Sequence, residues 1–414
     1  MKETNSPATG PRRRHYGYII ILCCCLIMGV DVGLLMSCAG IFYAPVSEAL
    51  GVSVGSFGIY MSLSFITSSL MLSVAGRMME RYSARWILTG ASALGGLVLT
   101  GMGCATALWQ FYVLGAVMGM VLAFLMYLSF PMLINRWFRT RVGFFIGICS
   151  AASGIGGVVF NPIGGAIIEA WGWRAAYLVF AAMVLLIVTP LLAWLLRDRP
   201  SDMGLEPNGD PEKSGTKKAV RALPDMMFGQ AVRTGKFYAL LLFAFLIMAV
   251  STFNLFIPKF TLTCGFDQIQ SSYAASAIMA GVTIGKILLG HINDRNCLLG
   301  SLATCGLGAL GLVVLVVESS VLWAVLLGSF LFGWSYAGVT VQTAMLTRTA
   351  FGGKDYGQIF SIISMALAAG GAIASGAWGF LAEATSYPTA FLLGAALLVV
   401  AFALAAYSLR RKQS

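Results

Sequence analysis

The sequence predicts an all-α membrane protein in which twelve transmembrane helices form two parallel-related halves of six helices each. Three observations predict this fold. Of the 414 residues, 58% are hydrophobic and 10% are charged, against about 25% charged in an average soluble domain. Apolar runs long enough to cross a bilayer recur along the chain. Short motifs of the first half also return at one fixed spacing in the second half.

Twelve apolar runs have the length of a bilayer-spanning helix, which needs roughly 20 residues. No small-residue cleavage site follows a short apolar core near the start, so we expect no removed signal peptide. The predicted spans cover residues 17–41, 54–75, 86–104, 108–132, 143–168, 173–196, 236–260, 271–292, 298–317, 321–346, 356–382 and 387–409. They group into an N-terminal bundle (17–196) and a C-terminal bundle (236–409), set off by the polar segments 1–16, 197–235 and 410–414.

The net charge of +11 indicates topology and not nucleic-acid binding. Of the 27 lysines and arginines, only Arg174 and Lys259 fall in odd-numbered loops, and Lys286 lies within a span. The other positive charges lie in the termini and the even-numbered loops, which places these parts in the cytoplasm. We therefore expect a multi-pass protein of the bacterial inner membrane with both termini cytoplasmic. The nine cysteines show no disulfide or metal spacing, so no metal or other cofactor is expected.

The internal repeat has an offset of 214 residues. Gly143 and Gly357 are related by this offset, as are Ala176 and Ala390. A Gly-x-x-x-acid-Arg loop follows the second span and again the eighth. Its residues are Gly76, Glu80 and Arg81 in the first half and Gly290, Asp294 and Arg295 in the second. In parallel-repeat transporters the substrate lies between the halves near the midplane. We expect these loops, together with Arg141, to act in conformational gating.

Two ionisable residues lie well inside the predicted spans, Asp31 and Lys286. A charged residue in a membrane helix costs about 2.5–3.5 kcal/mol and usually marks an ion, substrate or proton site. The repeat places Phe245 and Leu72 at the corresponding positions of the other half, so the scaffold itself does not require these charges. We expect Lys286 to bind an anion, with a structural ion pair or snorkelling as the alternatives. We expect Asp31 to couple a proton, the alternative being a protonated carboxyl bonded to Ser37 or to a backbone carbonyl.

The sequence does not decide whether Asp31 and Lys286 are in direct contact. Counted from the inner span ends, their depths differ by about 12 Å, so contact would require helix tilt or different span ends. Polar and aromatic residues in otherwise aliphatic spans are further candidates for the substrate site. Core packing and lipid-interface anchoring are the alternative for the aromatic ones. The candidates are Tyr127, Asn254, Trp334, Tyr336 and Gln342.

The sequence lacks the motifs of several other membrane-protein classes. No Walker-type phosphate loop is present, so ATP is not expected to drive the protein directly. No metalloprotease or serine-hydrolase motif points to an enzyme. No TVGYG-like filter points to a channel.

Several stretches resemble the major facilitator superfamily, and within it the branch of oxalate/formate antiporters and monocarboxylate porters. They are residues 41–53, 76–81, 135–157, 172–179, 285–295 and 355–373. The resemblance implies that Lys286 takes the place of a cationic residue, usually arginine, that binds the substrate carboxylate. It also implies that Tyr127 and Tyr336 contact substrate. Lysine lacks the bidentate geometry of arginine, and residues 359–365 lack the second cation of the oxalate-type carrier.

Together these observations predict a secondary transporter of a small organic anion, above all a monocarboxylate. It would work by alternating access with proton symport or anion exchange, as a monomer in the lipid bilayer. One alternative is a proton-coupled exporter of an amphipathic or neutral solute. Another is a nutrient sensor of the same fold that binds without transporting.

Overall fold

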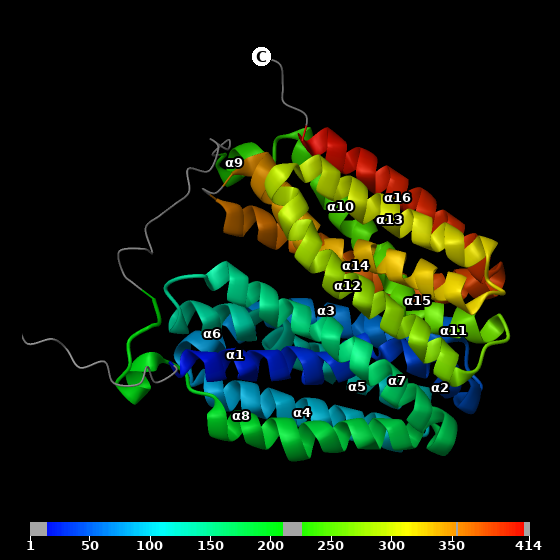
Figure 1. Ribbon diagram of the computed structural model, residues 1–414, viewed down its shortest axis with the longest axis horizontal. Helices are drawn as coiled ribbons and strands as arrows, with labels where there is room; N and C mark the ends of the chain where they lie inside the picture. Colours follow the sequence, from blue (N-terminus) through cyan, green and yellow to red (C-terminus); the bar gives the residue numbers. More distant parts are fainter. Residues whose placement is uncertain (1–14, 210–225, 353–354, 410–414) are drawn as a thin grey trace, which may run out of the picture.

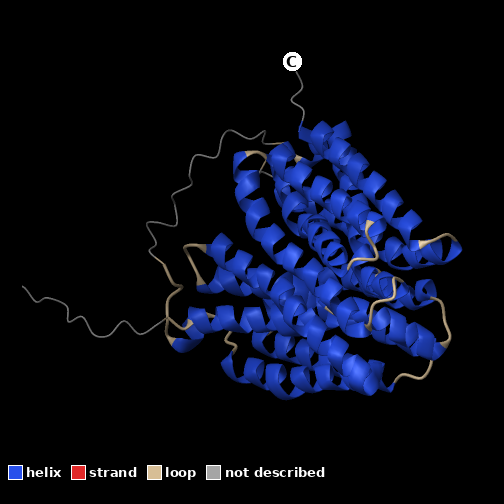
Figure 2. Cartoon of the chain, turned by 45° about the vertical axis from the view of Figure 1, so that its right-hand side comes forward, coloured by secondary structure: helices blue, strands red, loops and turns tan. Residues whose placement is uncertain are grey.

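The computed structural model describes residues 15–209, 226–352 and 355–409, and Figure 2 shows them as an almost purely helical assembly. Within these residues, eleven helices are long and apolar enough to cross a membrane. One of them, Val142–Leu195, contains 54 residues and has a non-helical Gly172 with φ 81°. Phe180 lies against Gly164 on the other side of this bend, so the chain reverses at Gly172. The eleven segments therefore make twelve crossings, as predicted.

The first half contains three π-helical stretches inside otherwise α-helical spans, and such stretches occur frequently at functional sites. They are η1, η3 and η4 in the series below. In chain order the elements are α1 (Gly17–Leu26), η1 (Ile27–Ser37), η2 (Ala39–Phe42), α2 (Tyr43–Leu50), α3 (Val54–Arg81), α4 (Ala84–Cys104), α5 (Leu108–Leu122), η3 (Ala123–Leu128), α6 (Ser129–Trp137), α7 (Val142–Met183), η4 (Val184–Val188) and α8 (Thr189–Leu195).

The second half follows the same plan after the short helix α9 (Phe228–Ala231). Its first span is interrupted by a 3₁₀ turn and by Pro258, which cannot donate a helical hydrogen bond. The elements are α10 (Gly235–Ser251), η7 (Thr252–Leu255), α11 (Ile257–Thr263), α12 (Gln268–Arg295), α13 (Cys297–Val317), α14 (Leu322–Phe351), α15 (Tyr356–Ala384) and α16 (Tyr387–Leu409).

The helix boundaries repeat in the register that the sequence motifs predict. Helices α2 and α11 begin at residues 43 and 257, and α3 and α12 begin at 54 and 268. Helices α5 and α14 begin at 108 and 322, and α7 and α15 begin at 142 and 356. Each pair differs by 214, so the two halves are structural copies of one six-helix unit.

The halves converge at one end of the molecule and diverge at the other. Figure 1 shows convergence toward α2 and α11, which we call the distal end, and divergence toward α6 and α9, which we call the linker end. Two pairs of helices meet across the interface, α7 with α12 and α3 with α15.

Glycines on α7 show where its contact with α12 ends. Gly154 lies directly against Thr283, and Gly157 lies directly against Met279. Nearer the linker end, Gly147 has open space where a side chain would be. The pair α3–α15 behaves in the same way, because Gly58 is in contact with Ser375 whereas Gly76, nearer the linker end, is open. Both helix pairs therefore pack tightly toward the distal end and separate toward the linker end.

Candidate functional site

The distal end is closed by contacts between charged side chains of one half and groups of the other. The Lys259 Nζ forms an ion pair with the Glu48 Oε1 at 2.5 Å. The backbone N–H of Val54 donates to the Glu383 Oε1 at 2.6 Å, and that of Gly55 donates to the same oxygen at 3.4 Å. A carboxylate is favourable there because the N-terminus of α3 carries partial positive charge. This closure could not be predicted from the sequence, although Lys259 is a rare positive charge outside the predicted cytoplasmic loops.

Lys286 lies on α12 where this helix crosses α7 of the other half. Its Nζ donates to the Ser150 carbonyl at 3.2 Å and to the Ser153 Oγ at 3.5 Å. The Ser37 Oγ, at the end of η1, donates to the Ser153 carbonyl at 3.3 Å. Among the residues that the structure describes, Lys286 forms no ion pair with a carboxylate. An ammonium has three donors, so this cation bridges the two halves through neutral oxygens and keeps capacity for a further acceptor.

The serines that contact Lys286 were not singled out in the sequence. One of them contributes only its backbone carbonyl, which leaves no mark on residue identity. Ser153 sits in a stretch rich in small residues, where serine usually serves helix packing. The only available signal was the position of α7 beside α12 in a parallel-repeat fold.

Asp31 lies inside the first half and away from the interface. It is 0% exposed; the Ser92 Oγ of α4 donates to its Oδ1 at 3.1 Å, and the Oδ2 has no partner. The Ser92 Oγ is also 3.1 Å from the Thr189 Oγ1 of α8. The bond to Ser37 that we considered as an alternative is not formed, because the Ser37 Oγ donates to the Ser153 carbonyl instead. No contact joins Asp31 to Lys286.

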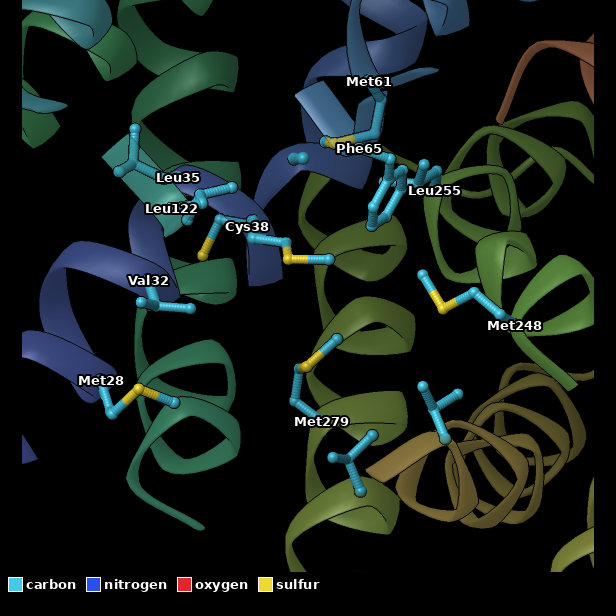
Figure 3. Packing of buried hydrophobic residues seen from close by; sticks show 14 of the residues in the cluster. Met28, Val32, Leu35, Cys38, Met61, Phe65, Leu122, Met248, Leu255 and Met279 are labelled. Atoms are coloured by element: carbon cyan, nitrogen blue, oxygen red, sulfur yellow. The ribbon is translucent and has the colours of Figure 1, made fainter. Parts of the chain in front are cut away.

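A small pocket lies between the halves toward the closed end. Two of the predicted substrate residues line it, Asn254 of η7 and Tyr336 of α14. The remaining lining residues are mostly apolar: Met36, Met61, Phe65, Met248, Ser251, Thr252 and Leu255. Figure 3 shows the side chains of Met61, Phe65, Met248 and Leu255 around one space. These residues could not be singled out in the sequence, because methionine and phenylalanine in an apolar span look like ordinary core.

Tyr127 lies on η3 of the first half and is 42% exposed. It is not among the residues that line the pocket, so its contact with substrate stays a prediction.

Trp334 and Gln342 face the interior of the second half and do not line the pocket. Trp334 packs against Leu289 and Ala337. The Gln342 Nε2 donates to the Ser301 Oγ at 2.8 Å, and its Oε1 accepts from the Asn293 Nδ2 at 2.9 Å. Residues two and six positions apart on a helix point about 200° and 240° apart, so neither side chain can share the face of Tyr336. We therefore correct both from substrate candidates to packing residues.

The expected gating residues all lie at the linker end. Their charged side chains are exposed, and in the described parts of the chain none of them bonds to the opposite half. Gly76 and Gly290 have open space around them, since the helix pairs are apart here. The charged members are Glu80, Arg81, Arg141, Asp294 and Arg295.

One family model, the Major Facilitator Superfamily, matches residues 25–327 and 288–414. The chain belongs to the major facilitator superfamily. This major facilitator protein is 24% identical to the oxalate:formate antiporter of Oxalobacter formigenes, over 98% of the chain and 95% of the relative. It is 28% identical to monocarboxylate transporter 12 of Rattus norvegicus, over 55% of the chain and 50% of the relative. The resemblance to the oxalate/formate and monocarboxylate branch is thereby confirmed.

A solved structure supports the fold. The crystal structure of a bacterial homolog of the human lysosomal transporter Spinster, in an inward-facing and occupied conformation, superimposes with a TM-score of 0.72. The match covers 97% of each chain at 14% identity. This major facilitator protein is thus a multi-pass membrane transporter in family and fold, and not an enzyme.

Proposed function

We propose that this major facilitator protein transports a small organic anion, above all a monocarboxylate, and that Lys286 binds the carboxylate. The observation that carries the proposal is the position of this ammonium between the two halves, where all its hydrogen-bond partners are neutral. A cation inside a membrane protein is costly unless an anion or a polar cavity compensates it. A substrate carboxylate would supply that compensation. The names of the two sequence relatives, an oxalate:formate antiporter and a monocarboxylate transporter, point to the same chemistry.

The same contact suggests how binding couples to movement. Lys286 on α12 holds the Ser150 carbonyl on α7, so a carboxylate that takes this place removes one bond between the halves. Tyr127, Tyr336 and Asn254 are the polar groups that we place next to the bound anion. With the linker end assigned to the cytoplasm, this structure is the inward-facing state of a carrier in the bacterial inner membrane. Closure of the linker end would bring the two Gly-x-x-x-acid-Arg loops and Arg141 together.

Coupling belongs to the same proposal and takes one of two forms, proton symport through Asp31 or anion exchange. The carrier works as a monomer with both termini in the cytoplasm. A symporter would accumulate substrate under a pH gradient. An exchanger would require an anion on both sides.

The test is counterflow in proteoliposomes loaded in turn with formate, lactate, pyruvate, oxalate and an amino acid. We expect counterflow with a monocarboxylate, and a loss of at least about ten-fold in Lys286→Gln, since a hydrogen bond to a charged group contributes about 1.5–3 kcal/mol. Lys236→Gln, at the linker-end start of α10, is the matched control and should keep full activity.

Unchanged counterflow in a folded Lys286→Gln protein would contradict the anion site. Ligand-dependent thermal stabilisation without any counterflow would favour the transporter-fold sensor. If no carboxylate is transported and amphipathic neutral solutes are, the result would favour the exporter.

A further inference from the structure

The pocket between the halves has an apolar lining contributed by both of them. Met36 of η1 and Met61 and Phe65 of α3 come from the first half, and Met248 and Leu255 come from the second. Figure 3 shows Phe65 beside Leu255, with Met248 pointing into the same space. Methionine side chains are flexible and polarizable, so they adapt to apolar ligands of different shape. We call these five residues the methionine pocket.

Of the four polar residues around the methionine pocket, Ser251 and Thr252 are hydrogen-bonded within their own helix, and Asn254 and Tyr336 are neutral. The Ser251 Oγ donates to the Ile247 carbonyl at 2.6 Å, and the Thr252 Oγ1 donates to the Ala249 carbonyl at 2.7 Å. Both hydroxyl protons are therefore used within their own helix. No lysine, arginine or histidine is among the lining residues that the structure describes. A second carboxylate placed here would be buried without a cation, which is strongly unfavourable.

Lys286 and the methionine pocket lie at a similar depth between the halves. Gly285 packs against Ala337 and Trp334, so Lys286 sits at the depth of Tyr336, whose side chain lines the pocket. Helix α12 runs from the distal end to the linker end, and helical side chains lean toward the helix N-terminus. The lysine side chain therefore leans toward the distal end, where the pocket lies.

We infer that the cargo is a monocarboxylate with an apolar tail, whose carboxylate binds Lys286 and whose tail occupies the methionine pocket. The inference rests on the proposed function and narrows it. Formate lacks the tail, and oxalate would bring a second charge into an apolar space. Short-chain alkyl or aromatic carboxylates meet both requirements.

The experiment measures binding and not flux, because medium-chain acids cross bilayers unaided. The purified full chain is titrated with straight-chain carboxylates from formate to hexanoate, and with oxalate and hexanamide, while its thermal unfolding midpoint is recorded. The pocket has a volume of only about 10 Å³ in this conformation, so its flexible methionines must move aside to admit a tail. The half-saturating concentration should then fall about four-fold with each added methylene that enters the pocket. Hexanamide should bind at least ten-fold more weakly than hexanoate, because it lacks the charge that Lys286 recognises.

Two variants locate the tail. Met61→Gln keeps the side-chain length but adds polar atoms, so the gain per methylene should shrink while formate binding stays unchanged. Met248→Gln repeats the test from the other half if Met61→Gln does not fold. Met203→Gln, at an exposed linker residue, is the matched control and should keep the full gain.

Equal half-saturating concentrations for formate and hexanoate, or tightest binding of oxalate, would overturn the inference. If that binding still depended on Lys286, the anion carrier would stand without the tail pocket. Equal binding of hexanoate and hexanamide, unaffected by Lys286→Gln, would instead overturn the carboxylate site and with it the proposed function.

Discussion

The two charged side chains within the spans have different surroundings. Asp31 contacts a hydroxyl inside one half, whereas Lys286 holds a backbone carbonyl across the interface. Movement of the halves would therefore change the partners of Lys286 directly. Asp31 has an indirect link to the interface, because η1 also carries Ser37, whose hydroxyl donates to the carbonyl of Ser153, a partner of Lys286.

At this scale we predict the effect of Asp31→Asn. Asparagine has nearly the same shape and can keep the Ser92 bond, but it cannot take up a proton. Accumulation driven by a pH gradient should be lost, while counterflow at equal pH on both sides should be partly kept. Both are measured in the same proteoliposomes, with Asp202→Asn in the linker as the control. Survival of both transport modes would show that Asp31 has no proton role.

Both buried charges could be predicted from the sequence, since a lone charge in an apolar span is conspicuous and its counterpart in the other half is apolar. Their contacts could not be predicted. A carbonyl acceptor such as that of Ser150 has no residue signature, and Ser92 is indistinguishable from any other serine in a span. Sequence reasoning therefore located the charges and missed what holds them.

At the scale of elements, the face of α7 that meets α12 changes character along its length. Gly154 and Gly157 allow close approach, and Gly147 faces open space. The helix starts could be predicted because apolar runs and the 214-residue repeat mark them. The faces could not be predicted, because apolar and polar residues are mixed around α14 and mark no single apolar face. Trp334 and Gln342 therefore could not be separated from Tyr336 without the observed contacts.

We predict opposite effects for valine at two glycines of α7. Gly154→Val would collide with Thr283 and with the backbone of α12, so it should lower the thermal unfolding midpoint of the protein by several degrees. Gly147→Val meets no atom in this conformation and should leave the midpoint nearly unchanged. It should nevertheless slow turnover in the counterflow assay if α7 and α12 approach each other there in the opposite conformation. Equal midpoints for the two variants would contradict the observed change in packing.

At the scale of the whole molecule, few polar contacts hold the distal end closed. The Glu48–Lys259 pair is partly exposed, and such pairs contribute about 0.2–1 kcal/mol. The Glu383 carboxylate at the N-terminus of α3 adds a second contact, and the Gln268 Nε2 donates to the Ile41 carbonyl at 3.3 Å. These contacts add to the close packing of both helix pairs, so one substitution among them should loosen the distal end without opening it.

We predict that Lys259→Glu loosens the distal end, because it faces Glu48 with a like charge. The rate of hydrogen–deuterium exchange in residues 43–58 should rise by roughly two- to five-fold. An ion pair of this kind changes the fraction of molecules that are open at the distal end by about that factor. The double variant Glu48→Lys with Lys259→Glu restores opposite charges and should return exchange to the original level. Failure of the reversed pair to restore it would show that the ion pair does not contribute to closure.

The bridging ammonium has an electrical consequence. When the site opens to one side, the membrane voltage falls across the closed part of the protein on the other side. The charge at the site therefore crosses the field when the opening changes sides, even if its atoms hardly move. An unloaded carrier with a charged Lys286 would transfer one positive charge in each reorientation, and a full membrane crossing of one charge corresponds to about 2.3 kcal/mol per 100 mV. A bound monocarboxylate cancels that charge. One-for-one exchange would then be electrically silent, whereas the return of the empty carrier would respond to the voltage.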